Sequence, residues 1–176
     1  MLLKERYCRQ GESPADVYKR VAKVVSLKDK KFEEHLYKMM EAGTVMFSSP
    51  ILRNAGHKKN RTLHACYVLP ITDSMHGILG TLNTAGEITR AGGGFGVDFT
   101  PLRPRGSVLS GGGEASGPVS FMELFDVLLN VIRQGGWRRG AAMFALGHDH
   151  PDAVDFVRAK LTGRLQNANL SLIVTD

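Results

Sequence analysis

The two cysteines are the residues of this sequence best suited to redox or nucleophilic chemistry. Cys8 and Cys66 stand far apart and form no C-x-x-C pair, so they indicate neither a disulfide framework nor a zinc knuckle. In a reducing compartment both thiols are free, and a free cysteine is most often a small buried apolar residue. Cys66 falls on a predicted buried strand, where an inert core thiol is the usual outcome. The residue type alone leaves its role open.

A glycine run is the second pattern that could contact a ligand. Residues 92–96 let a backbone approach a ligand closely, because glycine has no Cβ and reaches positive φ freely. The run follows a predicted helix and precedes a predicted strand, the reverse of a P-loop or a dinucleotide fingerprint. A structural tight turn and an anion or sugar site are equal alternatives for it.

Two arginine pairs stand where they could contact phosphates. Arg138 and Arg139 lie beside glycines directly after a long predicted helix, and Arg103 and Arg105 flank a proline. Guanidinium forks suit phosphate oxygens and stack on bases. A solvated loop is the more common role for a bare pair of charges, so neither pair identifies a ligand by itself.

A short cluster of metal-ligand residue types comes late in the chain. His148, Asp149 and His150 offer imidazoles and a carboxylate, but alternate residues of a strand point apart and a third ligand is not evident. Their position just before Pro151 is typical of a helix cap. We therefore expect a helix start here and no metal site.

The elements that position these residues begin with a helical region, residues 1–60. Ser13 as the cap, Pro14 in the first turn and Asp16 completing a capping box predict a helix start. A second helix is expected over residues 28–42, with Gly43 as its stop. We expect this region to be a small helical lead-in that packs on the rest of the chain.

Residues 61–176 alternate short apolar runs with longer helical patterns, which predicts an α/β fold with a largely parallel sheet. The expected strands are 63–69, 95–99, 141–146 and 170–175, and the expected helices are 74–90, 119–134 and 151–161. The helix at 119–134 is apolar on more than one face, so we expect it to be buried on two sides, inside the domain or across a subunit interface. Residues 106–118 are expected to form a mobile loop. Four short strands are few for a parallel sheet, so we expect an incomplete one.

The composition excludes several classes of protein. A formal net charge of +6 favours an anionic partner, and 7% aromatic residues are too few for a platform that stacks single-stranded nucleic acid. No stretch reaches the roughly 18 uncharged apolar residues of a membrane helix, and the charged amino terminus has no signal-peptide core. We therefore expect a cytoplasmic protein that binds phosphorylated small molecules, with neither nucleic acid nor a membrane as partner.

Taken together and in order, these segments resemble the catalytic (large) subunit of ribonucleotide reductases. The similarity covers essentially the whole chain and places it in the amino-terminal portion of that subunit. Segments 115–121 and 150–152 are most similar to the adenosylcobalamin-dependent members. The segments that carry the resemblance are 48–56, 65–70, 73–75, 92–96, 102–104, 115–121, 134–136, 150–152 and 167–169.

The resemblance implies both a fold and a reaction. The fold is a helical amino-terminal region followed by the first half of a ten-stranded α/β barrel, with the substrate nucleotide bound inside it. The family reduces the ribose C2′ hydroxyl of ribonucleoside di- or triphosphates. A transient thiyl radical takes the 3′ hydrogen, and a cysteine pair supplies two electrons as it becomes a disulfide, which an external dithiol reductant restores.

The resemblance also implies roles for individual residues. Cys66 matches the first member of the reducing pair and is the catalytic residue expected in this chain. The substrate contacts it implies are Ser49, Ala65, Cys66 and Gly94. The effector contacts it implies, for a deoxynucleoside triphosphate or ATP, are Asp73, Ser74, Met75 and Arg103. In the family this specificity site lies near a helix-packed interface between two subunits, so a homodimer is implied. Gln134 and Arg138 match the loop that relays effector identity to substrate choice.

The sequence departs from the family pattern in what it lacks. The thiyl-radical cysteine and the second redox cysteine lie downstream in the family and are absent here, as is the downstream phosphate-binding segment. Trp137 and Glu114 alter two loops of the effector region. We therefore expect no turnover by this polypeptide alone, and a complementary carboxyl-terminal half as its partner. Adenosylcobalamin is the expected radical source, although its contacts do not map onto these residues. A class with a diiron or dimanganese partner subunit stays open.

Two other functions stay open. A non-catalytic nucleotide-binding remnant or regulatory module would keep the effector site without the reductase chemistry. A basic α/β adaptor would bind RNA phosphates through its arginine loops, with steeply salt-dependent affinity.

Overall fold

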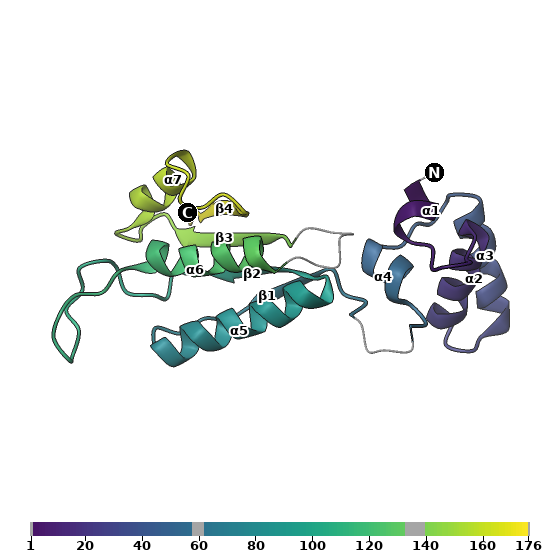
Figure 1. The fold of residues 1–176 in the computed structure, drawn as a ribbon, viewed down its shortest axis with the longest axis horizontal. Helices are drawn as coiled ribbons and strands as arrows, with labels where there is room; N and C mark the ends of the chain where they lie inside the picture. The colour runs from purple at the N-terminus through teal and green to yellow at the C-terminus, as the bar shows by residue number, and fades with distance from the viewer. Residues whose placement is uncertain (1, 58–61, 133–139, 176) are drawn as a thin grey trace. The chain divides into compact units, whose positions relative to one another are not determined.

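The computed structural model describes residues 2–57, 62–132 and 140–175 (Figure 1). These residues form two units, Met1–Ala65 and Cys66–Asp176. Each unit has a hydrophobic core of its own. The predicted order, a helical region followed by an α/β region, is confirmed.

The first unit consists of helices. They are α1 (Leu2–Arg6), α2 (Pro14–Val25), α3 (Lys30–Glu41) and α4 (Ser49–Asn54). The predicted capping box of α2 is present: Ser13 Oγ accepts from the Asp16 N–H, and the Asp16 carboxylate accepts from the Ser13 N–H. The core of the unit brings Val17 and Val21 of α2 together with Leu36 and Met40 of α3. Helices α1 and α4 are short, and the periodicity of the sequence did not predict them.

The second unit is a four-stranded sheet in which every pairing is parallel and the strand order is β1-β2-β3-β4. The strands are β1 (Cys66–Leu69), β2 (Gly94–Asp98), β3 (Ala142–Gly147) and β4 (Ala168–Ile173). The connecting helices are α5 (Met75–Ala91), α6 (Pro118–Val131) and α7 (Ala153–Leu161). The parallel α/β architecture predicted from the alternation of patterns is therefore confirmed.

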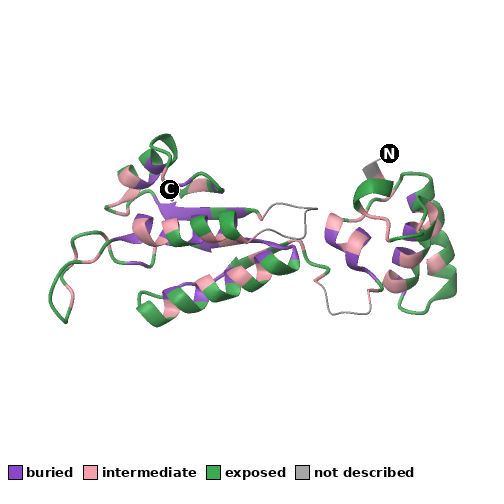
Figure 2. Ribbon diagram, in the orientation of Figure 1, coloured by how far each residue is buried: buried purple, intermediate pink, exposed green. Residues whose placement is uncertain are grey.

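The three helices pack against one face of this sheet. Successive strand residues point to opposite faces, so Phe95 and Val97 of β2 and Phe144 of β3 reach the helices, where Phe125 of α6 joins them. The rings of Phe125 and Phe144 each meet Phe99 edge to face at a centroid distance of 5.4 Å. Most of β3 is buried by this packing, as Figure 2 shows.

Among the described residues of the second unit, no helix lies on the opposite face of the sheet. Val68 of β1 is 89% exposed and Met143 of β3 is 48% exposed. Between them β2 presents Gly96, with Gly94 before it on the same face, because Cα register pairs Val68 with Gly96 and Gly96 with Met143. The exposed Asp98 ends the strand on this face. We call this surface the open face. At its centre the glycines of β2 expose the backbone, and on either side the side chains of Val68 and Met143 reach solvent.

One expectation about a single element is corrected, and two others are described further by the structure. The strand predicted over 63–69 begins at Cys66, which is exposed and not part of the core, because β1 is at the edge of the described sheet and Cys66 faces away from the helices. The loop predicted over 106–118 contains a hydrogen-bonded hairpin, in which the Gly106 N–H donates to Ala115 O at 2.9 Å, and its mobility stays a prediction. Within the second unit helix α6 buries one side, and Val127 remains 58% exposed, so burial of the other side across a subunit interface stays a prediction. No helix of the described segments is long and apolar enough to cross a membrane.

Candidate functional site

Cys66 and Gly94 lie side by side at the amino ends of neighbouring strands. Each is the first residue of its strand, and the two are partners in the parallel register of β1 and β2. Alternation along the strands puts both on the open face, where the Cys66 side chain is exposed. A Cβ at Gly94 would stand 2.9 Å from the carbonyl oxygen of Ala141, so the close packing of β2 on the start of β3 requires glycine here.

The two other predicted substrate contacts belong to the first unit. Ser49 is the first residue of α4, and its Oγ lies 2.8 Å from the Oη of Tyr7. Ala65 is the last residue of that unit and directly precedes Cys66 in the chain. The structure therefore brings together Cys66 and Gly94, whereas Ser49 and Ala65 are positioned by a separate unit.

Two arginines hold the carboxyl end of α4. Arg20 donates from Nη1 to Ala55 O at 2.7 Å, and Arg9 donates from Nη2 to the same oxygen at 2.9 Å. Arg20 also pairs with Glu12 through Nε at 2.7 Å and Nη2 at 3.0 Å. Hydrogen bonding from Arg20 lowers the pKa of the Glu12 carboxyl, so that the pair stays charged at neutral pH. The sequence analysis missed this clamp, which fixes the helix that carries Ser49.

The four predicted effector residues gather at the opposite, carboxyl end of the sheet. Asp73 follows β1 and Arg103 follows β2, and the Arg103 Nε donates to Asp73 Oδ2 at 2.7 Å. Ser74 caps α5 by accepting from the Gly77 N–H at 3.0 Å, and Met75 opens the helix with 57% of its surface exposed. Carboxyl ends of parallel strands share one edge, which is why residues thirty positions apart in sequence meet here.

The electrostatics of this end suit an anion. Helix α5 has 17 residues, and its amino terminus carries partial positive charge from unpaired backbone N–H groups. Arg103 uses only Nε toward Asp73, and among the described residues neither of its Nη groups makes a hydrogen bond. The side chain is 42% exposed, so both Nη groups are within reach of a ligand. The arrangement can present a guanidinium fork beside a helix start.

Gly77 allows a tight turn at the carboxyl end of the sheet. A Cβ at this position would overlap with the hydroxyl of Thr72 and stand 2.9 Å from Thr72 O. The Ser74 N–H donates to that same carbonyl oxygen at 2.8 Å. Residues 72–77 thus fold back on themselves around a position with no side chain. The sequence analysis did not single out this glycine, although a glycine in the first turn of a predicted helix is a usable signal.

The histidines near residue 150 have structural partners. The Asp152 N–H donates to His150 Nδ1 at 3.1 Å, which leaves the ring proton on Nε2 to be donated to Leu102 O at 2.9 Å. His148 Nδ1 lies 3.2 Å from Ile173 O. Helix α7 begins at Ala153, two residues later than predicted. In the parts of the chain that are described, no three His, Cys, Asp or Glu side chains could share a metal ion.

Two family models together match nearly all of the chain. The all-alpha domain of ribonucleotide reductase matches residues 1–60, and the barrel domain of ribonucleotide reductase matches residues 64–176. The chain belongs to the ribonucleotide reductase family. The resemblance seen in the sequence is therefore confirmed, as is the partial α/β barrel behind a helical region.

Several named relatives of this reductase chain depend on vitamin B12. A vitamin B12-dependent ribonucleoside-diphosphate reductase of Mycobacterium tuberculosis (strain CDC 1551 / Oshkosh) is 41% identical over 192 aligned positions, covering 99% of this chain and 28% of that protein. The enzyme of the same description from Thermoplasma acidophilum is 48% identical over 132 positions, covering 73% of this chain and 17% of that protein. The chain thus spans little more than a quarter of the length of the mycobacterial relative.

A solved structure shows the same fold. The alpha subunit of the class Id ribonucleotide reductase of Actinobacillus ureae superposes with a TM-score of 0.85 at 25% identity. The match covers 97% of this reductase chain and 32% of that subunit. Both the helical region and the sheet are therefore shared with a reductase subunit whose name gives its class as Id, whereas the names of the relatives above give vitamin B12 dependence.

The two thiols of the reductase chain differ in environment. Cys8 is partly buried in the first unit, and this burial, followed by the neighbouring Glu12 carboxylate, raises the pKa of its thiol. Cys66 is exposed on the open face. Because the thiolate is the nucleophile, Cys8 is expected to be the slower thiol in alkylation at neutral pH. Two further predicted positions, Gln134 and Arg138, lie outside the described residues.

Proposed function

We propose that this chain supplies the first redox cysteine, the substrate contacts and the allosteric specificity site of a ribonucleoside di- or triphosphate reductase. The observation that carries the proposal is the exposed Cys66 at the amino end of β1, next to Gly94 on the open face. A thiol beside bare backbone leaves room for a sugar to approach sulfur directly. Ser49, Ala65, Cys66 and Gly94 are the proposed substrate contacts.

The proposed role of Cys66 is that of an electron donor. Reduction removes the C2′ hydroxyl as water and leaves hydrogen at C2′, while two thiols lose two electrons and two protons and join as one disulfide. Cys66 provides one of these thiols. The second thiol, and the thiyl radical that takes the 3′ hydrogen, belong to segments outside these 176 residues. A separate dithiol reductant then reduces the disulfide again.

The proposed effector is a deoxynucleoside triphosphate or ATP. The Arg103 guanidinium and the start of α5 suit its phosphates, with Asp73, Ser74 and Met75 around them. Gln134 and Arg138 are proposed to relay its identity to the substrate site. Exposed apolar residues on α5 and α6, including Leu79 at 47% and Val127 at 58%, support a homodimer formed through these two helices.

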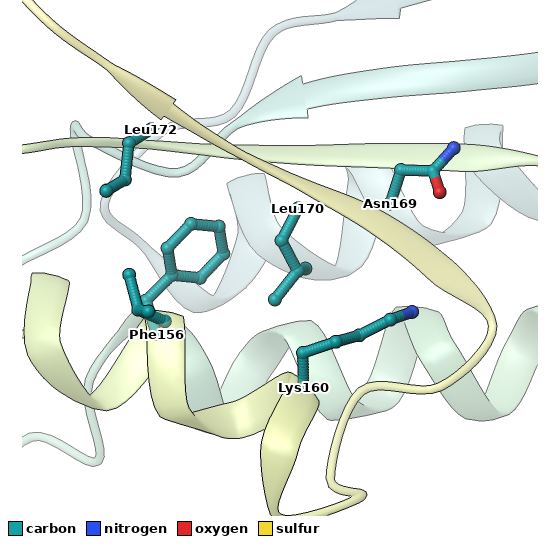
Figure 3. A pocket seen from close by; sticks show the side chains of 6 residues that line it. Phe156, Lys160, Asn169, Leu170 and Leu172 are labelled. Atoms are coloured by element: carbon teal, nitrogen blue, oxygen red, sulfur yellow. The ribbon is translucent and has the colours of Figure 1, made fainter.

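The radical source proposed for the assembled enzyme is adenosylcobalamin, which would generate the thiyl radical. The support is the vitamin B12 dependence in the names of relatives. A cavity of about 470 Å³ lies between α7 and β4, lined by Phe156, Leu170 and Leu172 (Figure 3). A corrin with its nucleotide tail is larger than this space, so we assign no residue of this chain to cobalamin.

The proposal is tested by replacing each cysteine in the assembled enzyme. The chain is combined with the carboxyl-terminal part of a B12-dependent reductase, and multiple turnover with a dithiol reductant is measured. Cys66→Ser should abolish turnover while nucleotide binding stays within about twofold of the parent. The control Cys8→Ser should keep turnover. Full multiple-turnover activity of Cys66→Ser would show that the assignment of Cys66 is wrong.

A second candidate function is a non-catalytic nucleotide-binding module. It is favoured by one observation: the effector residues lie together within one unit, whereas the substrate residues are divided between two. Tight binding of deoxynucleoside triphosphates, with no activity after addition of any reductase carboxyl-terminal part, would support this module over the reductase.

A further inference from the structure

We infer that Tyr7 is a positioning residue for the substrate, acting through the hydroxyl of Ser49. The Tyr7 Oη and the Ser49 Oγ are 2.8 Å apart although the residues are 42 positions apart in sequence. The inference rests on the proposed role of Ser49 as a substrate contact. No motif of the family resemblance includes Tyr7.

The acidity of the two hydroxyls determines which of them donates their shared hydrogen bond. A phenol is more acidic than an alkyl alcohol, so Tyr7 is the better donor and Ser49 the better acceptor of their shared hydrogen bond. A serine oxygen that accepts from Tyr7 has its own hydrogen free. That hydrogen can then be donated to an anionic phosphate oxygen, which needs donors and offers none. Tyr7 thereby selects the serine rotamer and hydrogen orientation that a substrate diphosphate requires.

The surroundings hold both partners in place before substrate arrives. The Tyr7 ring packs against the core of the first unit, and the Tyr7 N–H donates to Leu3 O at 3.0 Å. Pro50, directly after Ser49, is buried, and the far end of α4 is clamped by Arg20 at Ala55. Because both partners of the hydrogen bond are held in place, the Ser49 hydroxyl loses little further freedom when it binds a ligand, and this favours affinity.

The neighbouring Ser48 provides a natural contrast. It is the N-cap residue of α4, yet its side chain makes no capping hydrogen bond within the described residues. Ser48 and Ser49 therefore carry adjacent hydroxyls in different settings. Tyr7 orients the hydroxyl of Ser49, whereas the hydroxyl of Ser48 makes no capping bond in the described part of the chain. Tyr37 is a second contrast, because its hydroxyl donates to Glu41 at 2.9 Å in the same unit, on another helix.

The test is a double-mutant cycle on the chain combined with the carboxyl-terminal part of a B12-dependent reductase, with cytidine 5′-diphosphate as the substrate probe and dGTP as the effector probe in calorimetric titrations. Tyr7→Phe keeps the ring and removes only the hydroxyl. It should weaken CDP binding by about three- to tenfold, which is the net worth of one hydrogen bond, and leave dGTP binding unchanged. Ser49→Ala should weaken CDP binding at least as much. The double variant should be no weaker than Ser49→Ala alone.

Controls and contrary outcomes separate this inference from the proposed function. Tyr37→Phe and Ser48→Ala should bind both probes like the parent chain. The inference is overturned if Tyr7→Phe binds CDP normally, or if its loss simply adds to that of Ser49→Ala. It is overturned as well if Ser49→Ala has no effect, although the effector site would then stand. Failure of the parent assembly to bind either nucleotide would instead contradict the proposed function itself.

Discussion

The two ends of the sheet are built in opposite ways. At the amino end, Cys66 and Gly94 are adjacent. A Cβ at position 94 would stand 2.9 Å from the carbonyl oxygen of Ala141, so this position requires glycine. At the carboxyl end, Asp73 and Arg103 form an ion pair beside the capped start of α5. One end offers an exposed thiol over open backbone, and the other offers charge and oriented N–H groups. The difference supports the two proposed roles, reduction of a sugar at one end and binding of a triphosphate at the other.

The largest effect is expected at Gly77, in the turn of the carboxyl end. Gly77→Ala forces a methyl group against the hydroxyl and carbonyl of Thr72, so we expect a loss toward the upper end of the about 1–3 kcal/mol that overpacking costs. Binding of a deoxynucleoside triphosphate should weaken at least about tenfold, since residues 73–75 must shift. Chemical denaturation and calorimetric titration measure the two effects.

Gly80 is the matched control for that substitution. It lies on the same helix, and a Cβ there meets no described atom within 4 Å. Gly80→Ala should therefore stabilise the chain by about 0.5–1 kcal/mol, because alanine loses less backbone entropy in a helix. If Gly77→Ala and Gly80→Ala change stability and nucleotide binding equally, Gly77 does not shape the carboxyl end of the sheet.

The amino end is tested next, at Gly94. A methyl group there would press on the backbone oxygen of Ala141, which cannot rotate away, so Gly94→Ala should destabilise the chain by about 2 kcal/mol. Gly96 is two residues along the same strand and face, where a Cβ would find ordinary contacts at 3.8 Å from Met143 O. Gly96→Ala should cost less than about 0.5 kcal/mol. If both variants unfold at the same denaturant concentration, glycine at the amino end has no steric role.

The smallest expected effect compares two threonines of α5. Thr81 Oγ1 donates to Pro70 O at 2.8 Å, just past the carboxyl end of β1, whereas the buried Thr89 Oγ1 has no hydrogen-bond partner among the residues that the structure describes. Thr81→Val should destabilise the chain by about 1 kcal/mol, and Thr89→Val should be neutral or stabilising, because it removes an unpaired hydroxyl. Thermal unfolding of both variants measures this difference, and the reverse order would contradict it.

How far the sequence predicts this molecule varies from residue to residue. The capping box at Ser13 and Asp16 and the parallel α/β order were predictable, because caps and apolar periodicity are local. The exposure of Cys66 was not, since burial of a strand depends on which layers cover it. The resemblance named Asp73 and Arg103 as effector contacts, but neither it nor any spacing rule predicted the ion pair between them. Tyr7 was missed altogether, because its contact with Ser49 depends on two short helices that the periodicity did not predict.

The most direct test of the account is a titration of the full chain with dGTP, comparing Arg103→Ala with Arg90→Ala. Arg90 is the control because its partner, Glu87, is a neighbour on exposed α5 surface. We predict that the parent chain binds dGTP, that Arg103→Ala weakens binding at least about tenfold, and that Arg90→Ala leaves it unchanged. Equal binding by the parent and both variants, or no binding by the parent, would contradict a triphosphate site at the carboxyl end of the sheet.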